Sequence, residues 1–218
     1  MKLIAALLDL LYPPRCAFCH CLAQPGEGPV CPRCRKELPY TRGRGAEVHG
    51  NFFKLCCAPL YYENDVRRSL HRYKFGGAAG CAAAYAPILE DCVREHLAGE
   101  YELLSWVPLS KKRLRERGYD QARLLAEATA PLLGLPAVPT LEKRRNTAKQ
   151  STIGAAEQRR ANIAGAYRVP DPERVRGRRI LLLDDIVTTG STFSECAATL
   201  REAGAAQVVC AAVARRRD

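Results

Sequence analysis

The feature that most restricts the fold is residues 180–192, which read Ile-Leu-Leu-Leu-Asp-Asp-Ile-Val-Thr-Thr-Gly-Ser-Thr. The aliphatic run is typical of a parallel strand that is buried on both faces. A helix should follow, because Thr192 and Glu195 have capping-box spacing and an apolar helical face comes after them. Gly204 ends that helix, and residues 207–213 form the next strand. The stretch therefore predicts a β-α-β unit and an α/β fold with a parallel sheet.

The loop before that helix has the composition of a phosphate-binding site. The N-terminus of a helix offers unpaired backbone N–H groups and a partial positive charge, and Gly190 lets the backbone approach a ligand closely. The hydroxyl donors around it are Thr188, Thr189, Ser191 and Thr192. No lysine follows the glycine, so this is not a nucleoside-triphosphate P-loop. Asp184 and Asp185 would repel a phosphate and suit vicinal hydroxyls or a hydrated Mg²⁺ better.

A ligand with a phosphate, a diol and a metal-bound polyanion fits this loop, and phosphoribosyl pyrophosphate (PRPP) is such a ligand. The pattern D-D-x-x-T-T-G-x-T also closely resembles the PRPP-binding motif of type I phosphoribosyltransferases. The resemblance implies that Asp184 and Asp185 contact the ribose hydroxyls and that residues 188–192 hold the 5′-phosphate. The alternative is an ordinary strand-turn-helix with a capped start. The length of the match favours PRPP.

Four cysteines near the N-terminus have the spacing of a zinc ribbon. Cys16 and Cys19 form one C-x₂-C pair, and Cys31 and Cys34 form another after eleven intervening residues. Two such pairs can place four thiolates at the corners of a tetrahedron. We therefore predict a structural Zn²⁺ on these residues. The histidine and cysteine that follow Cys19 leave ligand exchange open.

The remaining cysteines bear on the cellular compartment. The chain has eleven cysteines and shows no export signal, which favours a cytoplasmic protein whose scattered thiols are buried. His49, Cys56 and Cys57 leave a second metal site open, although we find no fourth ligand. No apolar run reaches the length of a membrane span.

The length leaves room for one α/β core and a small appendage, because the chain has 218 residues. We expect an N-terminal helix and zinc-ribbon-like module at residues 1–50 and a phosphoribosyltransferase-like domain at 51–218. Residues 39–50 are polar and without periodicity, and we predict a linker there. A helix at 78–97 should be kinked or broken at Pro87.

A basic segment follows a second predicted buried strand at residues 103–109. Basic side chains at the carboxyl end of a strand lie at the edge where α/β sheets bind ligands. We predict a pyrophosphate loop and cationic flap there, and a mobile lid at residues 142–160. A solvated turn is the alternative to the flap. The flap residues would be Lys111, Arg113, Arg115 and Arg117, with Lys74 from an earlier helix.

A resemblance to the ComF family of competence proteins extends over the whole chain. The matching positions are Leu-Leu-Asp-Leu-Leu-Tyr-Pro-Pro-Arg-Cys at 7–16, Tyr73-Lys74-Phe75, Arg117-Gly118-Tyr119-Asp120-Gln121, Arg145, Thr147, Gln150, Arg159 and Asn162. The resemblance implies a zinc-binding segment joined to a phosphoribosyltransferase-like domain, and a link to uptake or use of external DNA. Many members carry further C-x-x-C pairs, where this chain has only Cys56-Cys57. Asp120 stands where the family usually has Asn.

Two functions are consistent with these features. In the first, the chain transfers a phosphoribosyl group: Asp184 and Asp185 steady the ribose as positive charge builds at C1′, and Mg²⁺ neutralises the leaving pyrophosphate. We recognise no acceptor pocket, so the acceptor and catalysis itself are left open.

In the second function, PRPP is a ligand or sensor, and the chain is a non-catalytic competence factor that binds single-stranded DNA. The net charge of +11 suits a polyanion, although a solvated basic surface would explain it equally well. Candidate stacking residues are Phe52, Phe53, Tyr61 and Tyr62. Other competence proteins are further candidate partners, and the sequence leaves the oligomeric state open.

Overall fold

A computed structural model of the chain describes residues 13–24, 26–144 and 165–217. Residues 7–12 of the predicted opening motif and most of the predicted lid lie outside the described residues. So do the motif positions Arg145, Thr147, Gln150, Arg159 and Asn162. No helix in the described part of the chain is both long and apolar enough to cross a membrane.

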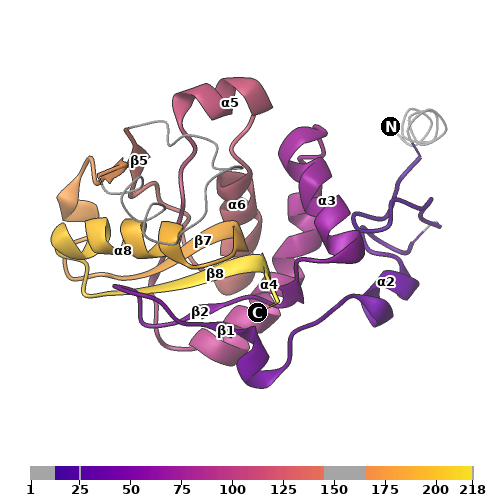
Figure 1. Ribbon diagram of the computed structural model, residues 1–218, viewed down its shortest axis with the longest axis horizontal. Helices are drawn as coiled ribbons and strands as arrows, with labels where there is room; N and C mark the ends of the chain where they lie inside the picture. The colour runs from indigo at the N-terminus through magenta and orange to yellow at the C-terminus, as the bar shows by residue number, and fades with distance from the viewer. Residues whose placement is uncertain (1–12, 25, 145–164, 218) are drawn as a thin grey trace.

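A mostly parallel sheet forms the centre of the protein (Figure 1). Its order is β1 (Glu47–Val48), β2 (Cys56–Cys57), β8 (Gln207–Arg215), β7 (Arg179–Val187) and β4 (Leu103–Trp106), and β3 (Leu60–Tyr61) also pairs with β8. Every pair is parallel except β1–β2. The predicted α/β class with a parallel sheet is confirmed, and the aliphatic run lies in β7, between β4 and β8.

Helices cover both faces of this sheet. They are α3 (Asn64–Phe75), α4 (Cys81–Leu97) and α6 (Gln121–Leu133) on one face and α8 (Ser191–Glu202) on the other. Successive side chains of a strand point to opposite faces, so Leu181 and Leu183 enter the core beneath α4 and α6. Ile180 and Leu182 enter the core beneath α8. Both faces of β7 are therefore buried, as an uninterrupted aliphatic strand requires.

Helix α4 continues through Pro87 and is not broken there. Proline removes one backbone N–H, which leaves the carbonyl of Ala83 without its helical partner. Ala83 and Pro87 both lie on the exposed side of the helix. Water can therefore satisfy the free carbonyl, and the helix tolerates the residue.

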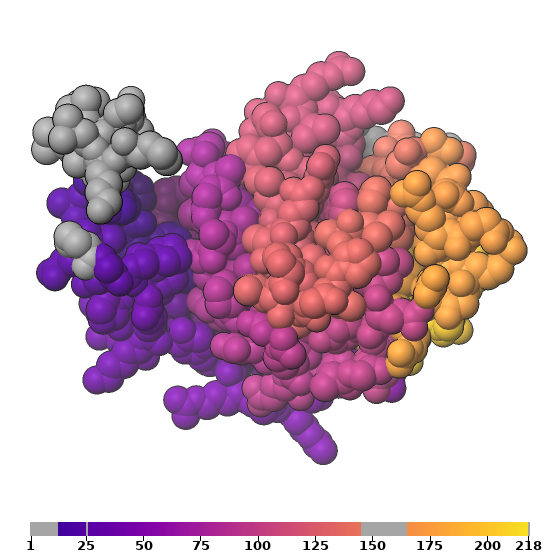
Figure 2. Space-filling view, turned by 180° about the vertical axis from the view of Figure 1, so that it is seen from behind, coloured from indigo at the N-terminus to yellow at the C-terminus, as the bar shows by residue number. Residues whose placement is uncertain are grey.

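The N-terminal module lies at one end of the molecule, beside α3 (Figures 1 and 2). Its described part contains α2 (Pro32–Glu37), and η1 (Gly43–Ala46) follows. Residues 39–50 are not a free linker, because the Thr41 N–H donates to the Pro59 carbonyl at 2.8 Å and β1 pairs with β2. A two-residue strand and a single 3₁₀ turn are too short to show periodicity. The division at residue 50 stays a prediction.

The start of α8 differs from the predicted capping box. Its N-cap is Gly190, which has a φ of +70°. Glu195 instead accepts a hydrogen bond from the N–H of Gly165 at 2.7 Å. The left-handed glycine turns the chain into the helix, a conformation that L side chains adopt only with strain. No side chain in the described part of the chain caps the helix, so Thr192 is free to face a cavity.

Candidate functional site

A polar cavity lies at the carboxyl end of β7, which is the edge where α/β sheets bind ligands. Its charged lining residues are Lys74, Arg113, Arg117, Lys143, Asp184 and Asp185. We call this space the anion cavity, because four cations there face two carboxylates. They come from α3, α5 (Lys111–Arg117), β5 (Glu142–Lys143) and β7. Segments far apart in the sequence thus meet at the predicted strand end.

The two aspartates reach the anion cavity from opposite faces of the sheet. Asp185 shares the face of Leu183 and is 3% exposed, and its Oδ2 lies 2.9 Å from Lys74 Nζ of α3. Asp184 shares the face of Leu182, and its Oδ1 accepts the backbone N–H of Asp185 at 2.8 Å. The pKa of Asp184 is raised well above its ordinary value, mainly by burial and secondly by the nearby charge of Asp185. Lys74 therefore compensates only part of the negative charge of the pair.

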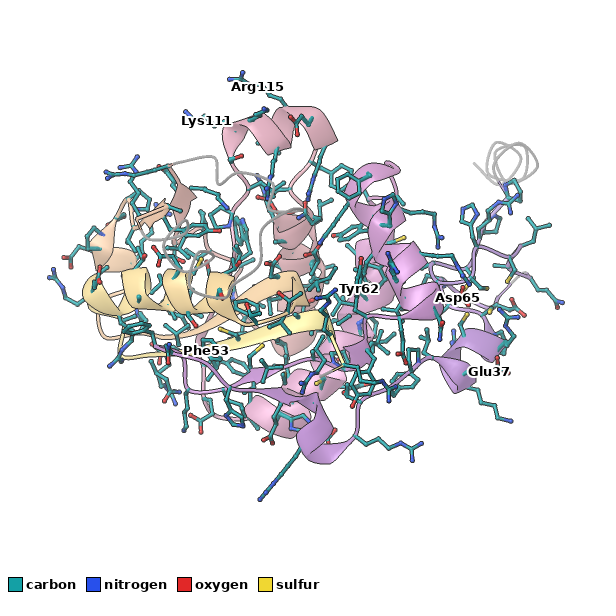
Figure 3. All side chains as sticks on the ribbon, viewed as in Figure 1. Glu37, Phe53, Tyr62, Asp65, Lys111 and Arg115 are labelled. Atoms are coloured by element: carbon teal, nitrogen blue, oxygen red, sulfur yellow. The ribbon has the colours of Figure 1, made fainter. Side chains whose placement is uncertain are left out.

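Helix α5 divides the predicted flap residues into two groups. Arg113 and Arg117, one helical turn apart, line the anion cavity. Lys111 and Arg115 point away from the body of the protein (Figure 3). Burial lowers the pKa of Arg117, and one of its buried nitrogens, Nη1, has no hydrogen-bond partner within the described residues. An unpaired buried guanidinium nitrogen can donate to an anionic ligand.

Three polar residues that line the anion cavity were not predicted as site residues. Lys143 donates a hydrogen bond to the Tyr167 hydroxyl at 2.9 Å, across the pair of β5 and β6 (Tyr167–Arg168). Burial, followed by nearby Arg113, lowers the pKa of Lys143. Gln121 is 3% exposed, and its Oε1 has no partner in the described part of the chain. Gln121 carried a signal, because it ends a motif shared with the ComF family, and Lys143 lies within the predicted lid. Tyr167 carried none.

The two family motifs on α3 and at the start of α6 contact each other. The Tyr73 hydroxyl donates to the Gln121 carbonyl at 2.7 Å, and the Tyr119 hydroxyl donates to the Tyr73 carbonyl. The Arg117 guanidinium lies over the Phe75 ring, 4.9 Å from its centroid. These contacts hold the end of α3 against the start of α6, and with it Lys74 beside the acid pair.

The predicted phosphate loop lies between the anion cavity and a second cavity. Thr192 lines the anion cavity, whereas Thr188 and Thr189 are exposed and line the second cavity. The Thr189 and Ser191 hydroxyl groups are 2.8 Å apart. Gly190 is buried, and an added Cβ there would lie 3.5 Å from the ring of Phe53. The loop hydroxyls are thus not gathered in one space, and Ser191 lines another cavity, beside Phe52.

Asp120 has a structural role that was not predicted from the sequence, because it links the start of α6 to the loop before α5. Its Oδ1 accepts the N–H groups of Ala122 and Arg123 and caps α6. Its Oδ2 accepts the Leu109 N–H at 3.0 Å, in the loop that lines the anion cavity. Burial raises the pKa of the Asp120 carboxyl. An asparagine here would keep the cap but offer no acceptor to Leu109.

Asp120→Ala is expected to lower the free energy of unfolding by about 1–2 kcal/mol, because it removes an N-cap and the partner of a loop N–H. Asp120→Asn should cost less, because its amide oxygen keeps the cap. Urea unfolding of both variants beside the wild type measures the difference. Equal losses in the two variants would contradict a capping role.

The four predicted zinc ligands are brought together. The sulfur atoms of Cys16, Cys19, Cys31 and Cys34 all lie within 4.8 Å of one another. A closed set of four thiols fits a structural zinc ion. Exposed Cys21, whose Sγ is 3.2 Å from that of Cys19, is not part of this set.

A second metal site is not supported by the geometry. Within the described residues the four-cysteine set is the only group of three or more ligand side chains that could hold an ion. Cys56 and Cys57 are completely buried in β2, and burial raises the pKa of the Cys56 thiol. His49 has a side chain that is 75% exposed. The two cysteines are therefore core residues.

Two family models match separate parts of the chain. Residues 7–54 match the model of the double zinc ribbon domain, and residues 120–218 match that of the phosphoribosyl transferase domain. The chain is 38% identical over 203 residues to the DNA utilization protein YhgH of Escherichia coli O157:H7, covering 88% of this chain and 86% of that protein.

Two further relatives carry competence names. Competence protein F of Haemophilus influenzae is 29% identical over 197 residues, covering 86% of this chain and 85% of the relative. Competence protein ComFC of Bacillus subtilis is 29% identical over 201 residues, covering 89% and 80%. Fold and motifs together define a protein with a phosphoribosyltransferase-like domain and an N-terminal zinc ribbon. More narrowly, the chain belongs to the ComF family, which includes competence protein F, ComFC and YhgH.

Proposed function

We propose that this protein binds PRPP together with Mg²⁺ in the anion cavity and along residues 188–192. The observation that supports the proposal best is that one cavity beside the start of α8 holds four cationic side chains and the acid pair Asp184 and Asp185. The negative charge of this pair is only partly compensated, because the pKa of Asp184 is raised. The 5′-phosphate would meet the N-terminus of α8 and the loop hydroxyls. The ribose hydroxyls would meet Asp184 and Asp185, and the pyrophosphate would meet Arg113 and Arg117.

The same arrangement supports transfer of the phosphoribosyl group to an acceptor. As pyrophosphate leaves C1′, positive charge develops on the ribose ring, and the carboxylates of Asp184 and Asp185 would stabilise it. Bound Mg²⁺ would offset charge on the leaving group. Arg113, Arg117 and Lys143 would stabilise the rest of that charge. Catalysis also requires an acceptor nucleophile, whose identity the fold does not specify.

Calorimetry with PRPP and Mg²⁺ tests binding directly. Saturable binding at one site per chain supports the proposal, and no detectable heat at millimolar PRPP overturns it. Release of pyrophosphate, screened across nucleobases and amines, then separates an enzyme from a sensor. Release that depends on one acceptor class identifies a transferase.

A second candidate function is binding of single-stranded DNA, in a cytoplasmic protein that acts with other competence proteins. The observation that favours it is the second cavity, lined by Arg44, Arg217 and Tyr61 beside Thr189. Nearby Phe52 is 65% exposed and has a φ of +69°. Exposed aromatic rings beside cations suit a single strand. The names of the relatives, which refer to competence and DNA utilization, support this candidate.

The four aromatic residues named as stacking candidates are not equivalent. Phe53 is 5% exposed and packs edge-on against Phe193, so it belongs to the core. Arg217 covers one face of Tyr61, with its guanidinium 4.1 Å from the ring centroid. Tyr62 is only partly exposed. Phe52 is therefore the best candidate for stacking on a base.

If about four phosphates are neutralised, affinity for a single strand should fall roughly 50-fold between 50 and 200 mM salt. Fluorescence anisotropy with a labelled oligonucleotide measures this dependence. Arg44→Ala should make the salt dependence shallower, because it removes one phosphate contact. Phe52→Ala should weaken binding and keep the slope. Affinity that is independent of salt would contradict the DNA-binding candidate.

A further inference from the structure

The first cysteine pair of the ribbon is docked on α3 through backbone carbonyl groups. Arg72 donates hydrogen bonds to the carbonyls of Ala17 and Phe18, at 2.9 and 2.8 Å. Ser69, one turn earlier on α3, also donates to the Ala17 carbonyl. Ala17 and Phe18 lie between the ligand pair Cys16 and Cys19. The backbone that places two predicted zinc ligands is thus fixed by one helix.

An aromatic contact joins the same two parts of the protein. Phe18 is fully buried, and its ring centroid is 5.5 Å from that of Tyr85 on α4. Tyr85 in turn contacts Tyr73 of α3 edge-on, at 5.3 Å between centroids. The ribbon therefore shares the core that supports α3, and it is more than an appendage.

The residues that follow Arg72 on α3 belong to the anion cavity. Tyr73 is anchored to the start of α6, and Lys74 pairs with Asp185 at 2.9 Å. Figure 1 shows α3 between the N-terminal module and α6. Two nearby residues of α3 therefore contact the two sites: Arg72 binds the ribbon backbone, and Lys74 pairs with Asp185.

We propose that α3 couples zinc binding by the ribbon to ligand binding in the anion cavity, with Arg72 as the positioning residue. The proposal rests on the proposed function, because it takes PRPP as the ligand. Without zinc, the four thiols have no common partner and the backbone at Ala17 and Phe18 is released. Arg72 and Ser69 then lose their acceptors, and the end of α3 is held less firmly. Lys74 consequently spends less time beside Asp185.

Coupling between two sites is reciprocal for equilibrium binding. Zinc-loaded protein is therefore expected to bind PRPP with Mg²⁺ at least about fivefold more tightly than zinc-stripped protein, at the low end of common coupling factors. PRPP should in turn slow the transfer of zinc from the ribbon to a chromogenic chelator. Circular dichroism of the stripped, full-length protein establishes that its sheet remains folded.

Two matched substitutions keep the test valid if the stripped protein aggregates. Arg72→Met removes two guanidinium-to-carbonyl bonds between the ribbon and α3. Arg35→Met removes bonds of the same kind, to the carbonyls of Val30 and Glu27, within the ribbon. Both variants should retain zinc. Arg72→Met should bind PRPP about fivefold or more weakly, Arg35→Met should bind it like the wild type, and Arg72→Lys should recover part of the loss.

The outcomes separate this proposal from the proposed function. If the wild type does not bind PRPP, the proposed function itself fails. If it binds PRPP and the affinity is the same with and without zinc, and in Arg72→Met, then coupling through α3 is refuted while PRPP binding stands. If Arg35→Met weakens PRPP binding as much as Arg72→Met, the effect is general destabilisation, and the positioning role of Arg72 is overturned.

Discussion

Cys34→Ser is expected to abolish zinc binding and to unfold the N-terminal module. Cys34 is 3% exposed within the four-cysteine set, so a serine hydroxyl there offers a poor ligand with no room for rearrangement. Structural zinc sites contribute on the order of 10 kcal/mol to the folding of small modules. Zinc content should fall from about one ion per chain to near zero, by metal analysis of the purified protein.

Cys21→Ser is the matched control for the zinc prediction. Cys21 is exposed, lies close to Cys19 and stands outside the four-cysteine set. This variant should keep its zinc, and a protease should cut its N-terminal module no faster than that of the wild type. A wild-type protein without zinc, or a Cys34→Ser variant with undiminished zinc, would refute the assignment. Equal loss in both variants would point to ligand exchange at Cys21.

The same substitution also measures how far the ribbon supports the rest of the chain. Cys16 and Phe18 are fully buried and belong to the cluster that includes Leu70 of α3 and Leu89 of α4. Loss of the ribbon should therefore lower the melting temperature of the phosphoribosyltransferase-like domain as well. The sheet itself should remain folded, because the face of β7 beneath α8 packs in a separate cluster that contains none of the four cysteines or Phe18.

Structural features that depend on residues close together in the sequence could be predicted. The aliphatic run at 180–183 shows a strand buried on both faces, and the cysteine spacing shows the ribbon. The predicted capping box was wrong: Thr192 and Glu195 have the right spacing, but the N-cap is the left-handed Gly190, two residues before Thr192. Local propensity was correct for the presence of the helix and wrong for its first residue.

The parts of the site that escaped prediction depend on contacts between distant segments. Lys143 and Tyr167 lie on two-residue strands, which carry no periodic signal, and they meet across 24 positions of sequence. The flap residues form a helix, so Arg113 and Arg117 face the cavity together. Arg72 donates hydrogen bonds to backbone carbonyl groups, and such contacts cannot be predicted from a pattern of side chains.

The double variant Asp184→Asn, Asp185→Asn is expected to bind PRPP at least about tenfold more weakly, a loss of about 1.4 kcal/mol. The substitution keeps shape and hydrogen bonding but removes both charges that would attract Mg²⁺ and steady the ribose. Calorimetry with PRPP and Mg²⁺ measures the loss. Asp171→Asn removes a half-exposed carboxylate at the N-cap of η2 (Pro172–Arg174) and should leave PRPP affinity unchanged.

The two single variants should change stability in opposite directions. The raised pKa of Asp184 means that the folded protein holds this proton more tightly than the unfolded chain does. Its contribution to stability is therefore greatest at low pH and falls as the pH rises from the unfolded pKa towards the folded one. Asp184→Asn removes that loss and should raise the melting temperature at neutral pH. Asp185→Asn leaves the partly buried Lys74 without its partner and should lower it.

This pair of measurements distinguishes a ligand site from a structural ion pair. If the acid pair has no part in ligand binding, neither single substitution changes PRPP affinity. If the acid pair serves the ligand, Asp184→Asn raises the melting temperature and also weakens PRPP binding. The buried Asp184 carboxylate then costs stability but is kept because the ligand needs it. Equal PRPP affinity in the wild type and the double variant would mean that the carboxyl end of β7 is not the PRPP site.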